Sequence, residues 1–307
     1  MKTKLLDLIV CPDCKSPLLL RAAKQEGAEI MEGTLTCRND HAYTIVNAVP
    51  RLIRSDDYVD TFSFQWNKFS KVQLDIYNGT TESETTLVEK TGFHEDEVKD
   101  KLMLDAGVGS GRFSEVVSRW GGEVVGIDLS YAVDAAYRNI GSRPNVHIIQ
   151  ADIFNLPFKE NTFDYIFSVG VLHHTPDTEQ AFKRLVPLLK PDGEIAIWVY
   201  TKYFEWLHKP STFLRKFTTK MPKRVVYYLS TIAVPLYFAW PFSKIIFPLF
   251  QLGYHKSARW RWLDTFDWYS PKYQWKHTYA EVFKWFKESG LSDITPLEHP
   301  VSMKGRK

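Results

Sequence analysis

The sequence predicts an α/β protein whose main domain is a largely parallel sheet with helices on both faces. Two observations within residues 101–200 indicate this fold. First, short apolar segments of the length of buried strands alternate with helical or turn-rich sequence; they span 101–105, 123–128, 146–152, 162–169 and 194–200. Strands that alternate with helices form a parallel sheet covered on both sides. Second, a glycine-rich loop follows the first of these segments.

The glycine-rich loop is the most specific signal in the chain. Residues 105–111 read Asp-Ala-Gly-Val-Gly-Ser-Gly, and a helix is expected directly after them. Glycine lets the backbone approach a ligand or adopt a positive φ, and the helix directs unpaired N–H groups toward the loop. A dinucleotide site needs Gly-x-Gly-x-x-Gly, but Arg112 replaces the third glycine in one register and Ser114 in the other. Asp105 instead offers a carboxylate to the ammonium group of an amino acid.

These residues resemble the first motif of the class I S-adenosylmethionine-dependent methyltransferases, an acidic residue followed by Gly-x-Gly-x-Gly. The resemblance extends over residues 100–200 and implies a Rossmann-like methyltransferase sheet. It also implies that Asp128, 17 residues after Gly111, binds the ribose hydroxyls, and that Asp152 accepts a hydrogen bond from the adenine amino group. Taken singly, each aspartate at a strand end is as typical of a helix cap. The implied cofactor site consists of Asp105, Gly107, Gly109, Gly111, Asp128, Asp152, Ile153 and Ser168.

The segment after the fourth predicted strand bears on the methyl acceptor. Many base and amide N-methyltransferases have Asn-Pro-Pro-Tyr at this place, whereas residues 168–171 of this chain read Ser-Val-Gly-Val. We therefore expect methyl transfer from S-adenosylmethionine to a small-molecule, hydrophobic or lipid-like acceptor. His174 is the candidate catalytic base, or it only shapes the pocket. Two alternatives stay open: a methyltransferase of ribosomal or transfer RNA, and a non-catalytic methyltransferase-like scaffold that binds partners.

Residues 1–54 are expected to form a zinc-ribbon module, similar to the ribbons fused to or partnered with some methyltransferases. Cys11 and Cys14 form a C-x-x-C knuckle, and Cys37 with His41 supplies a second pair. Three cysteines and one histidine complete a tetrahedral site, so the zinc ion should be structural. Because so small a module hardly folds on its apolar core alone, we expect chelation to unfold it while the core still binds cofactor. A redox C-x-x-C is the alternative, but residues 15–17 do not begin a helix.

Length, cysteine usage and the first residues indicate a cytoplasmic enzyme. The 307 residues are enough for one large domain and a small one. All three cysteines are assigned to the metal, which suits a reducing compartment. The apolar segment at residues 5–10 is too short for the core of a signal peptide, and Asp7 interrupts it.

The net charge of +3 is unevenly distributed along the chain. Lys and Arg are balanced by Asp and Glu in residues 1–60 (8 against 9), outnumbered in residues 61–200 (13 against 20), and predominant in residues 201–307 (18 against 7). The basic part contains an apolar stretch: residues 225–243 carry no charge, and the run resumes after Lys244. Residues 201–260 are therefore expected to form an apolar helical cap, inserted after the fifth strand and lying over the carboxyl ends of the strands, where ligands bind in such sheets.

Three interpretations of this apolar stretch compete. A single transmembrane helix has the required length, but three prolines would interrupt it. A cap packed on the enzyme would bury its apolar side chains, whereas a cap that admits a greasy substrate or rests on a membrane through residues 225–250 must expose them. The flanking Lys and Arg residues favour an interfacial position and partial membrane association. Only the packed cap would bury all of the following four side chains: Leu229, Ile232, Leu236 and Phe238.

The rest of the chain completes the expected division into domains. Residues 55–100 form a helical lid or linker, which either packs on the core or covers the cofactor; apolar residues at 62, 66 and 69 have helical spacing. Residues 101–200 form the cofactor-binding core, in which a helix is expected at 176–189 and a turn at 190–193. Residues 261–307 form the C-terminal part of the fold, with a helix at 279–289 and a last strand pair near Ile294 and Val301. Residues 267–278, rich in polar aromatics, either line the substrate pocket or form a connecting loop.

Overall fold

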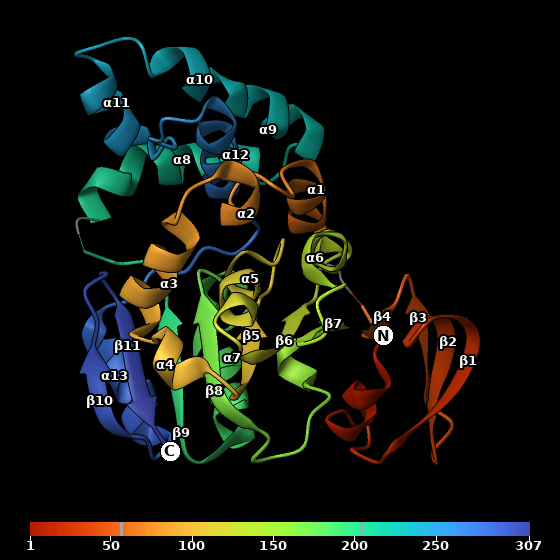
Figure 1. Ribbon diagram of the computed structural model, residues 1–307. Helices are drawn as coiled ribbons and strands as arrows, with labels where there is room; N and C mark the ends of the chain where they lie inside the picture. The colour runs from red at the N-terminus through yellow and green to blue at the C-terminus, as the bar shows by residue number, and fades with distance from the viewer. Residues whose placement is uncertain (56–57, 204) are drawn as a thin grey trace.

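The structure is a computed structural model that describes residues 1–55, 58–203 and 205–307; the other three positions fall within the predicted lid and cap. In the described residues one sheet of eleven strands has the order β1-β2-β3-β4-β7-β6-β5-β8-β9-β11-β10 (Figure 1). The strands are β1 Leu18–Glu26, β2 Glu29–Cys37, β3 Ala42–Val46, β4 Val49–Leu52, β5 Leu102–Ala106, β6 Glu123–Asp128, β7 Val146–Ala151, β8 Phe163–Val169, β9 Leu189–Trp198, β10 Ser292–Pro296 and β11 Ser302–Arg306.

The central part of the sheet is parallel, as predicted. Strands β7, β6, β5, β8 and β9 run in one direction, and β11 pairs antiparallel with both β9 and β10. All strands expected between residues 101 and 200 are present, and so is the last strand pair. The α/β prediction is therefore confirmed. Because the parallel strands share one direction, their carboxyl ends meet at a single edge of the sheet.

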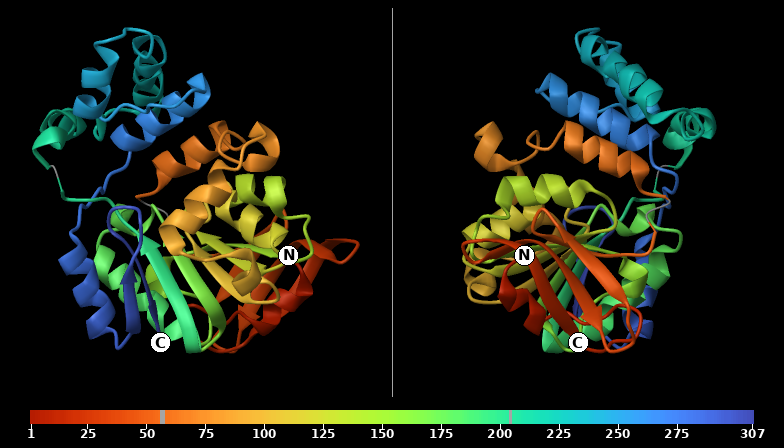
Figure 2. Two further views of the ribbon diagram at one scale, coloured as in Figure 1. Left: turned by 60° about the vertical axis from the view of Figure 1, so that its left-hand side comes forward. Right: turned by 90° about the vertical axis from the view of Figure 1, so that its right-hand side faces the viewer.

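Alternate residues of the buried strands supply two cores. On β5, Leu104 and Ala106 belong to one apolar cluster and Met103 to the other; on β6, Val125 and Val124 divide in the same way. A strand covered on both faces needs apolar residues at successive positions, which explains the unbroken apolar runs in the sequence. Helices α7 and α13 contribute to the first core, and α3, α4, α5 and α6 to the second (Figure 2). These helices are α3 Glu82–Thr91, α4 Glu95–Val98, α5 Arg112–Arg119, α6 Ala132–Ile140, α7 Thr178–Leu185 and α13 Tyr279–Glu288.

The N-terminal ribbon extends the main sheet. Its strands β1 to β4 are antiparallel, and β4 pairs parallel with β7 through Arg51 opposite Gln150. Its knuckle contacts the loop that follows β7: Lys15 Nζ donates a hydrogen bond to the Leu156 carbonyl at 2.9 Å, and the Val10 N–H to the Pro157 carbonyl at 2.9 Å. Leu5, Ile9 and Leu35 of the ribbon also belong to the first core. The ribbon therefore supports the core domain instead of standing apart from it.

The cap lies over the carboxyl ends of the strands, at the end of the molecule remote from the C-terminus (Figures 1 and 2). Helix α1 lies between the cap and the sheet and contacts α12 and α6. The helices are α1 Asp60–Lys68, α2 Asp75–Asn78, α8 Lys209–Thr218, α9 Lys223–Leu229, α10 Ala233–Leu236, α11 Ser243–Phe250 and α12 Ala258–Tyr269. No helix in the described part of the chain is long and apolar enough to cross a membrane. Leu229, Ile232 and Phe238 are exposed, so the fully packed cap is not observed.

Some boundaries differ from the predicted ones. The helix expected at 176–189 ends at Leu185, and a 3₁₀ turn that includes Pro187 follows, because proline lacks the N–H that continues a helix. The turn expected at 190–193 lies within β9, where Asp192 has a φ of 63° and the pairing with β8 shifts register. Helix α12 continues past residue 260, since Leu263 and Phe266 prolong its buried face. The first residues of the predicted polar-aromatic segment therefore belong to the cap.

Candidate functional site

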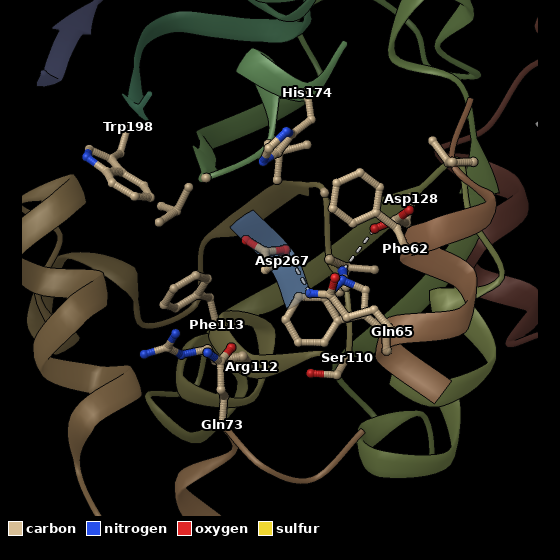
Figure 3. A pocket seen from close by; sticks show the side chains of 18 of the residues that line it. Phe62, Gln65, Gln73, Ser110, Arg112, Phe113, Asp128, His174, Trp198 and Asp267 are labelled. Carbon is tan, nitrogen blue, oxygen red and sulfur yellow. Dashed lines mark hydrogen bonds between the residues drawn. The ribbon is translucent and has the colours of Figure 1, made fainter. Parts of the chain in front are cut away.

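A cavity of about 410 Å³ lies at the carboxyl ends of the strands (Figure 3). The loops after β5, β6 and β8 line one side of it, and α1 and α12 line the other. Helix α3 also contributes, through Thr86 and Lys90. A cavity of this size is in the range of small-molecule sites, roughly 300–1,000 Å³. Two elements far apart in the sequence, α1 and α12, thus close the edge at which the strands end.

The glycine loop between β5 and α5 has a backbone that only glycine adopts easily. The φ angles are +110° at Gly107, +52° at Gly109 and +91° at Gly111. A Cβ atom on Gly107 would lie 2.2 Å from the Val171 side chain, so alanine does not fit there. Gly107 and Gly109 line the cavity, and Gly111 is the N-cap residue of α5. Trp66 of α1 lies close over Gly109, so α1 covers the loop.

Asp128 lines the cavity beside this loop. One carboxylate oxygen accepts a hydrogen bond from the Gly109 N–H at 3.0 Å, and the other accepts from the backbone and the hydroxyl of Ser130 at 2.8 and 2.7 Å (Figure 3). Burial raises the pKa of Asp128, although these hydrogen bonds oppose the shift. A half-buried, fixed carboxylate next to a glycine loop that lines the same cavity fits the recognition of sugar hydroxyls.

Asp105, at the end of β5, is turned toward α5. Its carboxylate accepts a hydrogen bond from Ser114 Oγ at 2.7 Å, and its side chain is buried. Burial raises the pKa of Asp105 to about 7, and the charge of Asp128 acts in the same direction. In the structure Asp105 ties the glycine loop to α5, and a contact with the cofactor's ammonium group stays a prediction.

The remaining predicted cofactor residues have different environments. Asp152 accepts a hydrogen bond from the Phe154 N–H at 2.9 Å, so it caps the 3₁₀ turn Ile153–Asn155, as the helix-cap alternative expects. Ile153 lines the cavity. Ser168 is fully buried, and its hydroxyl donates to the Ala106 carbonyl at 2.7 Å, so it joins β8 to β5. The roles of Asp152 and Ser168 toward a cofactor stay predictions.

His174 lines the cavity from the 3₁₀ turn after β8. Its Nδ1 lies 2.8 Å from the Tyr273 carbonyl. A carbonyl only accepts, so Nδ1 bears the proton and Nε2 keeps its lone pair. Burial lowers the pKa of His174 below its usual value, which keeps the ring neutral at pH 7. This is the state that a general base requires. Neighbouring His173 is buried and stacks on Tyr200, with ring centroids 3.8 Å apart.

Two carboxylates on α12 enter the cavity from the cap, and the sequence analysis did not single them out. Asp267 accepts a hydrogen bond from Gln65 Nε2 at 2.8 Å and from the Tyr200 hydroxyl at 3.4 Å (Figure 3). Asp264 accepts from Gln73 Nε2 at 3.4 Å. Burial, and then the charge of Asp267, raise the pKa of Asp264 to about 8. The sequence did contain a signal, because these are the first acidic residues after Glu205 and their i, i+3 spacing places them on one helix face.

Cations and aromatic rings complete the lining. Lys90 Nζ lies 3.2 Å from the centroid of the Trp198 ring, and burial together with the charge of Arg112 lowers the pKa of Lys90 to about 7. Arg112, the residue that breaks the dinucleotide pattern, donates hydrogen bonds to Ser83 Oγ and Thr86 Oγ1 at 3.1 and 3.2 Å and so joins α5 to α3. The cavity therefore has acidic, basic and aromatic groups on its acceptor side.

The main cavity is the first of three hollows in series. A second, of about 670 Å³, lies between α11 and α12 and shares Tyr200, Asp264 and Asp267 with the first. A third is an outer groove of about 1,280 Å³ lined by α8, α9, α10, α11 and α12, and it shares Leu252 with the second. The first two hollows have mixed polar and apolar linings, and only the outer groove is almost wholly apolar.

A separate metal centre lies in the ribbon. The ligand atoms of Cys11, Cys14, Cys37 and His41 all lie within 4.8 Å of one another. The two sulfur atoms of Cys14 and Cys37 are 3.6 Å apart, and Cys11 Sγ is 3.4 Å from His41 Nδ1. Tetrahedral zinc with bonds of about 2.3 Å has ligand atoms about 3.8 Å apart, so the four residues fit zinc. The four ligands leave no open position, which makes the site structural.

A chain of hydrogen bonds connects this centre to the cofactor side of the core. Cys11 Sγ lies 3.4 Å from the Tyr43 hydroxyl, which donates to Asp13 at 2.6 Å. Asp13 in turn accepts from Asn155 Nδ2 at 3.3 Å. Asn155 ends the 3₁₀ turn that begins with Ile153, a residue of the cavity lining. The metal centre thus supports a loop of the candidate site.

Comparisons with known families agree with both parts of the chain. Residues 104–197 match the family described as a methyltransferase domain, and residues 2–47 match the family of Trm112p-like proteins. The glycine loop, Asp128 and the cavity fit S-adenosylmethionine, and the ribbon fits structural zinc. The chain contains a class I S-adenosylmethionine-dependent methyltransferase domain. A Trm112p-like zinc ribbon precedes it.

Similar proteins differ in the acceptors that they are named for. The chain is 38% identical to phosphoethanolamine N-methyltransferase 2 of Caenorhabditis elegans over 121 residues, 37% of this chain and 27% of that protein. It is 33% identical to the tRNA U34 carboxymethyltransferase of Ruthia magnifica over 109 residues, 34% of each chain. It is 27% identical to the demethylmenaquinone methyltransferase of Corynebacterium kroppenstedtii over 168 residues, 52% of this chain and 69% of that protein. Of the first two relatives, the chain therefore spans about a third or less.

Two solved structures align with most of this chain. A Haemonchus contortus phosphoethanolamine N-methyltransferase 2 in complex with S-adenosyl-L-methionine has a TM-score of 0.47 at 19% identity, over 83% of this chain and 49% of that one. A complex between the Haloferax volcanii Trm112 methyltransferase activator and a methyltransferase has a TM-score of 0.46 at 14% identity, over 80% and 79%.

Proposed function

We propose that this protein transfers the methyl group of S-adenosylmethionine to a small amphipathic acceptor with a substantial apolar part. The observation that supports this most directly is the series of hollows: the main cavity shares Asp264 and Asp267 with a second cavity, which shares Leu252 with an outer groove whose lining is almost wholly apolar. A reacting polar group would lie in the first cavity, and the apolar part of the same molecule would extend toward the outer groove.

The residues of the main cavity divide this work between them. The glycine loop and Asp128 hold the cofactor, which supplies a sulfonium methyl that is already activated for displacement. Aromatic rings of α1 and β9, including Phe62 and Trp198, exclude water from the acceptor side. His174 accepts a proton at Nε2 when the acceptor must lose one, because its Nδ1 already donates to the Tyr273 carbonyl.

The polar group of the acceptor meets the two carboxylates of α12. Asp264 has a pKa of about 8, so it donates a hydrogen bond in its neutral form and attracts a cation in its charged form. Asp267 is oriented by Gln65 and Tyr200. A hydroxyl, a phenol or an amine fits these partners.

The basic C-terminal third supports RNA as the competing acceptor, and one experiment distinguishes the two. Transfer of labelled methyl from S-adenosylmethionine should be measured in parallel into a lipid extract, total RNA and soluble metabolites. We expect label in the lipid fraction, and none with the Asp128→Ala variant. Label in RNA alone would contradict the proposed acceptor class. No label in any fraction, together with calorimetry that detects no cofactor binding, would contradict the methyltransferase activity itself.

A further inference from the structure

The outer face of the cap exposes many large apolar side chains. Phe238 is 75% exposed, Trp240 70% and Tyr228 68%, although α9 to α11 bury other residues such as Val226 and Phe247. Further exposed apolar side chains on α8 to α11 and the turns between them are Phe213, Phe217, Met221, Val225, Leu229, Ile232, Phe242 and Ile245. The outer groove of about 1,280 Å³ lies among them. Exposed apolar patches beyond a few hundred Å² mark a surface that binds something.

Most of the cap carries charge of one sign, and its acidic residues are confined to Glu205 and to Asp264 and Asp267, which face the main cavity. Between Trp206 and Leu263 the sequence has ten basic residues and no acidic one. Two of these, Arg215 and Arg261, are buried and donate to backbone carbonyls. Lys223 pairs with Asp60, whereas no ion pair among the described residues involves Lys216, Lys220, Arg224 or Lys244. These four side chains are exposed around the apolar face, where their stems add to it and their charges reach outward.

From this combination we infer that the cap docks on the surface of an anionic phospholipid bilayer. Exposed Phe, Trp, Ile and Leu gain free energy in the acyl boundary, while surrounding Lys and Arg meet lipid phosphates. Nucleic acid would satisfy the charges but would leave aliphatic residues such as Ile232 and Ile245 in water. A second copy of this chain would bring two faces of the same sign together. The bilayer alone matches both properties.

Docking in this orientation would also let the acceptor enter from the membrane, and this part of the inference rests on the proposed function. The outer groove faces the bilayer and shares Leu252 with the second cavity, which in turn shares Asp264 with the main cavity. An amphipathic acceptor would therefore enter from the membrane with its polar group first. The ribbon strands β1 to β4 form one edge of the sheet, away from the cap, so the ribbon takes no part in the contact with the bilayer (Figure 1).

The test is sedimentation of the full-length protein with vesicles. Wild type should sediment with phosphatidylcholine vesicles that contain phosphatidylglycerol, less with pure phosphatidylcholine, and less when salt is raised, because screening weakens the charge attraction. Each of the substitutions Lys216→Gln, Lys220→Gln and Lys244→Gln should weaken binding by roughly fivefold, the equivalent of about 1 kcal/mol per charge. The triple variant Tyr228→Ser, Phe242→Ser, Ile245→Ser should abolish it.

Matched controls lie on other faces. Leu19, on ribbon strand β1, is 70% exposed, and Lys287 on α13 is also exposed. Leu19→Ser and Lys287→Gln should sediment as wild type. Asp128→Ala should also sediment as wild type, because docking does not need the cofactor; a loss of methyl transfer thus stays distinguishable from a loss of docking.

Four results would overturn the inference. One is a protein that stays in the supernatant with anionic vesicles at low salt. Another is a triple variant that sediments as wild type. The third is a shift of transfer RNA in a gel that the lysine variants weaken and the apolar variant does not. The fourth is a dimer in sedimentation equilibrium that does not bind vesicles and that the apolar variant dissociates. Folding of every variant is checked by its thermal transition.

Discussion

The Asp264→Asn substitution should stabilise the unliganded protein at alkaline pH and impair its function. Asp264 has a pKa of about 8 in the folded chain against 3.8 for the free side chain. The raised pKa leaves the free energy of unfolding unchanged below about pH 4. Between about pH 4 and pH 8 it lowers the free energy of unfolding increasingly, and above pH 8 it lowers it no further. Asparagine has nearly the same shape, still accepts from Gln73, and never ionises.

The magnitude follows from the shift and from the position of the side chain. At about 1.36 kcal/mol per pKa unit, a shift of about four units corresponds to a ceiling of roughly 5–6 kcal/mol. Asp264 is only half-buried and lines the cavity, so solvent screens its charge in the unliganded protein. We therefore expect a gain of about 1–3 kcal/mol at pH 8 and almost none near pH 4.5. At roughly 2–4 °C per kcal/mol, the thermal transition should rise by several degrees at pH 8 only.

The assay is thermal unfolding of both proteins across this pH range, with methyl transfer measured beside it. Asp105, whose pKa is about 7, contributes to both proteins and cancels from the difference. Asp192→Asn, which removes an exposed carboxylate on β9 outside the cavity, serves as the control. A gain of equal size at pH 4.5 and pH 8, or a loss of stability at pH 8, would refute the reasoning. The stabilised variant should transfer methyl groups more slowly, because the charge that destabilises the fold is the group that meets the acceptor.

Three further predictions concern the cofactor, the base and the metal. Asp128→Ala should weaken binding of S-adenosylhomocysteine by about 1.5–3 kcal/mol, roughly 10- to 160-fold by calorimetry, whereas Ser130→Ala should have a smaller effect; unchanged affinity in the first variant would remove the assignment. His174→Gln should lower kcat by about 10²–10⁴-fold and abolish the acid limb of the pH–rate profile, if the acceptor needs deprotonation; a retained limb would reduce His174 to a pocket-shaping role. Cys37→Ser should abolish zinc binding, as measured by metal analysis, and should also weaken cofactor binding, because Asp13 contacts Asn155. Full cofactor affinity in the zinc-free protein would instead support the expectation from the sequence that the core binds cofactor without the ribbon.

The spacing of residues along the sequence was sufficient to predict those features that depend on neighbouring residues only. The alternation of apolar strands with helices indicated the parallel sheet, because a strand buried on both faces must be apolar at successive positions. The glycines at 107, 109 and 111 indicated a tight loop, since their positive φ angles are a property of those residues alone. The two ligand pairs of the ribbon indicated one metal site, because two such pairs in turn-rich sequence are typical of a zinc ribbon.

Tertiary structure decided everything that depends on which distant residue covers a side chain. Gln65 and Asp267 are 202 positions apart, yet their hydrogen bond closes the cavity, and no periodicity reveals such a partner. The carboxylates at 105 and 152 look alike in the sequence, but one ties the glycine loop to α5 and the other caps a turn. An apolar stretch shows only that a face avoids water, and not whether protein covers that face. The packing of α8 to α12 left Tyr228, Phe238 and Trp240 uncovered, and only the folded chain determines that.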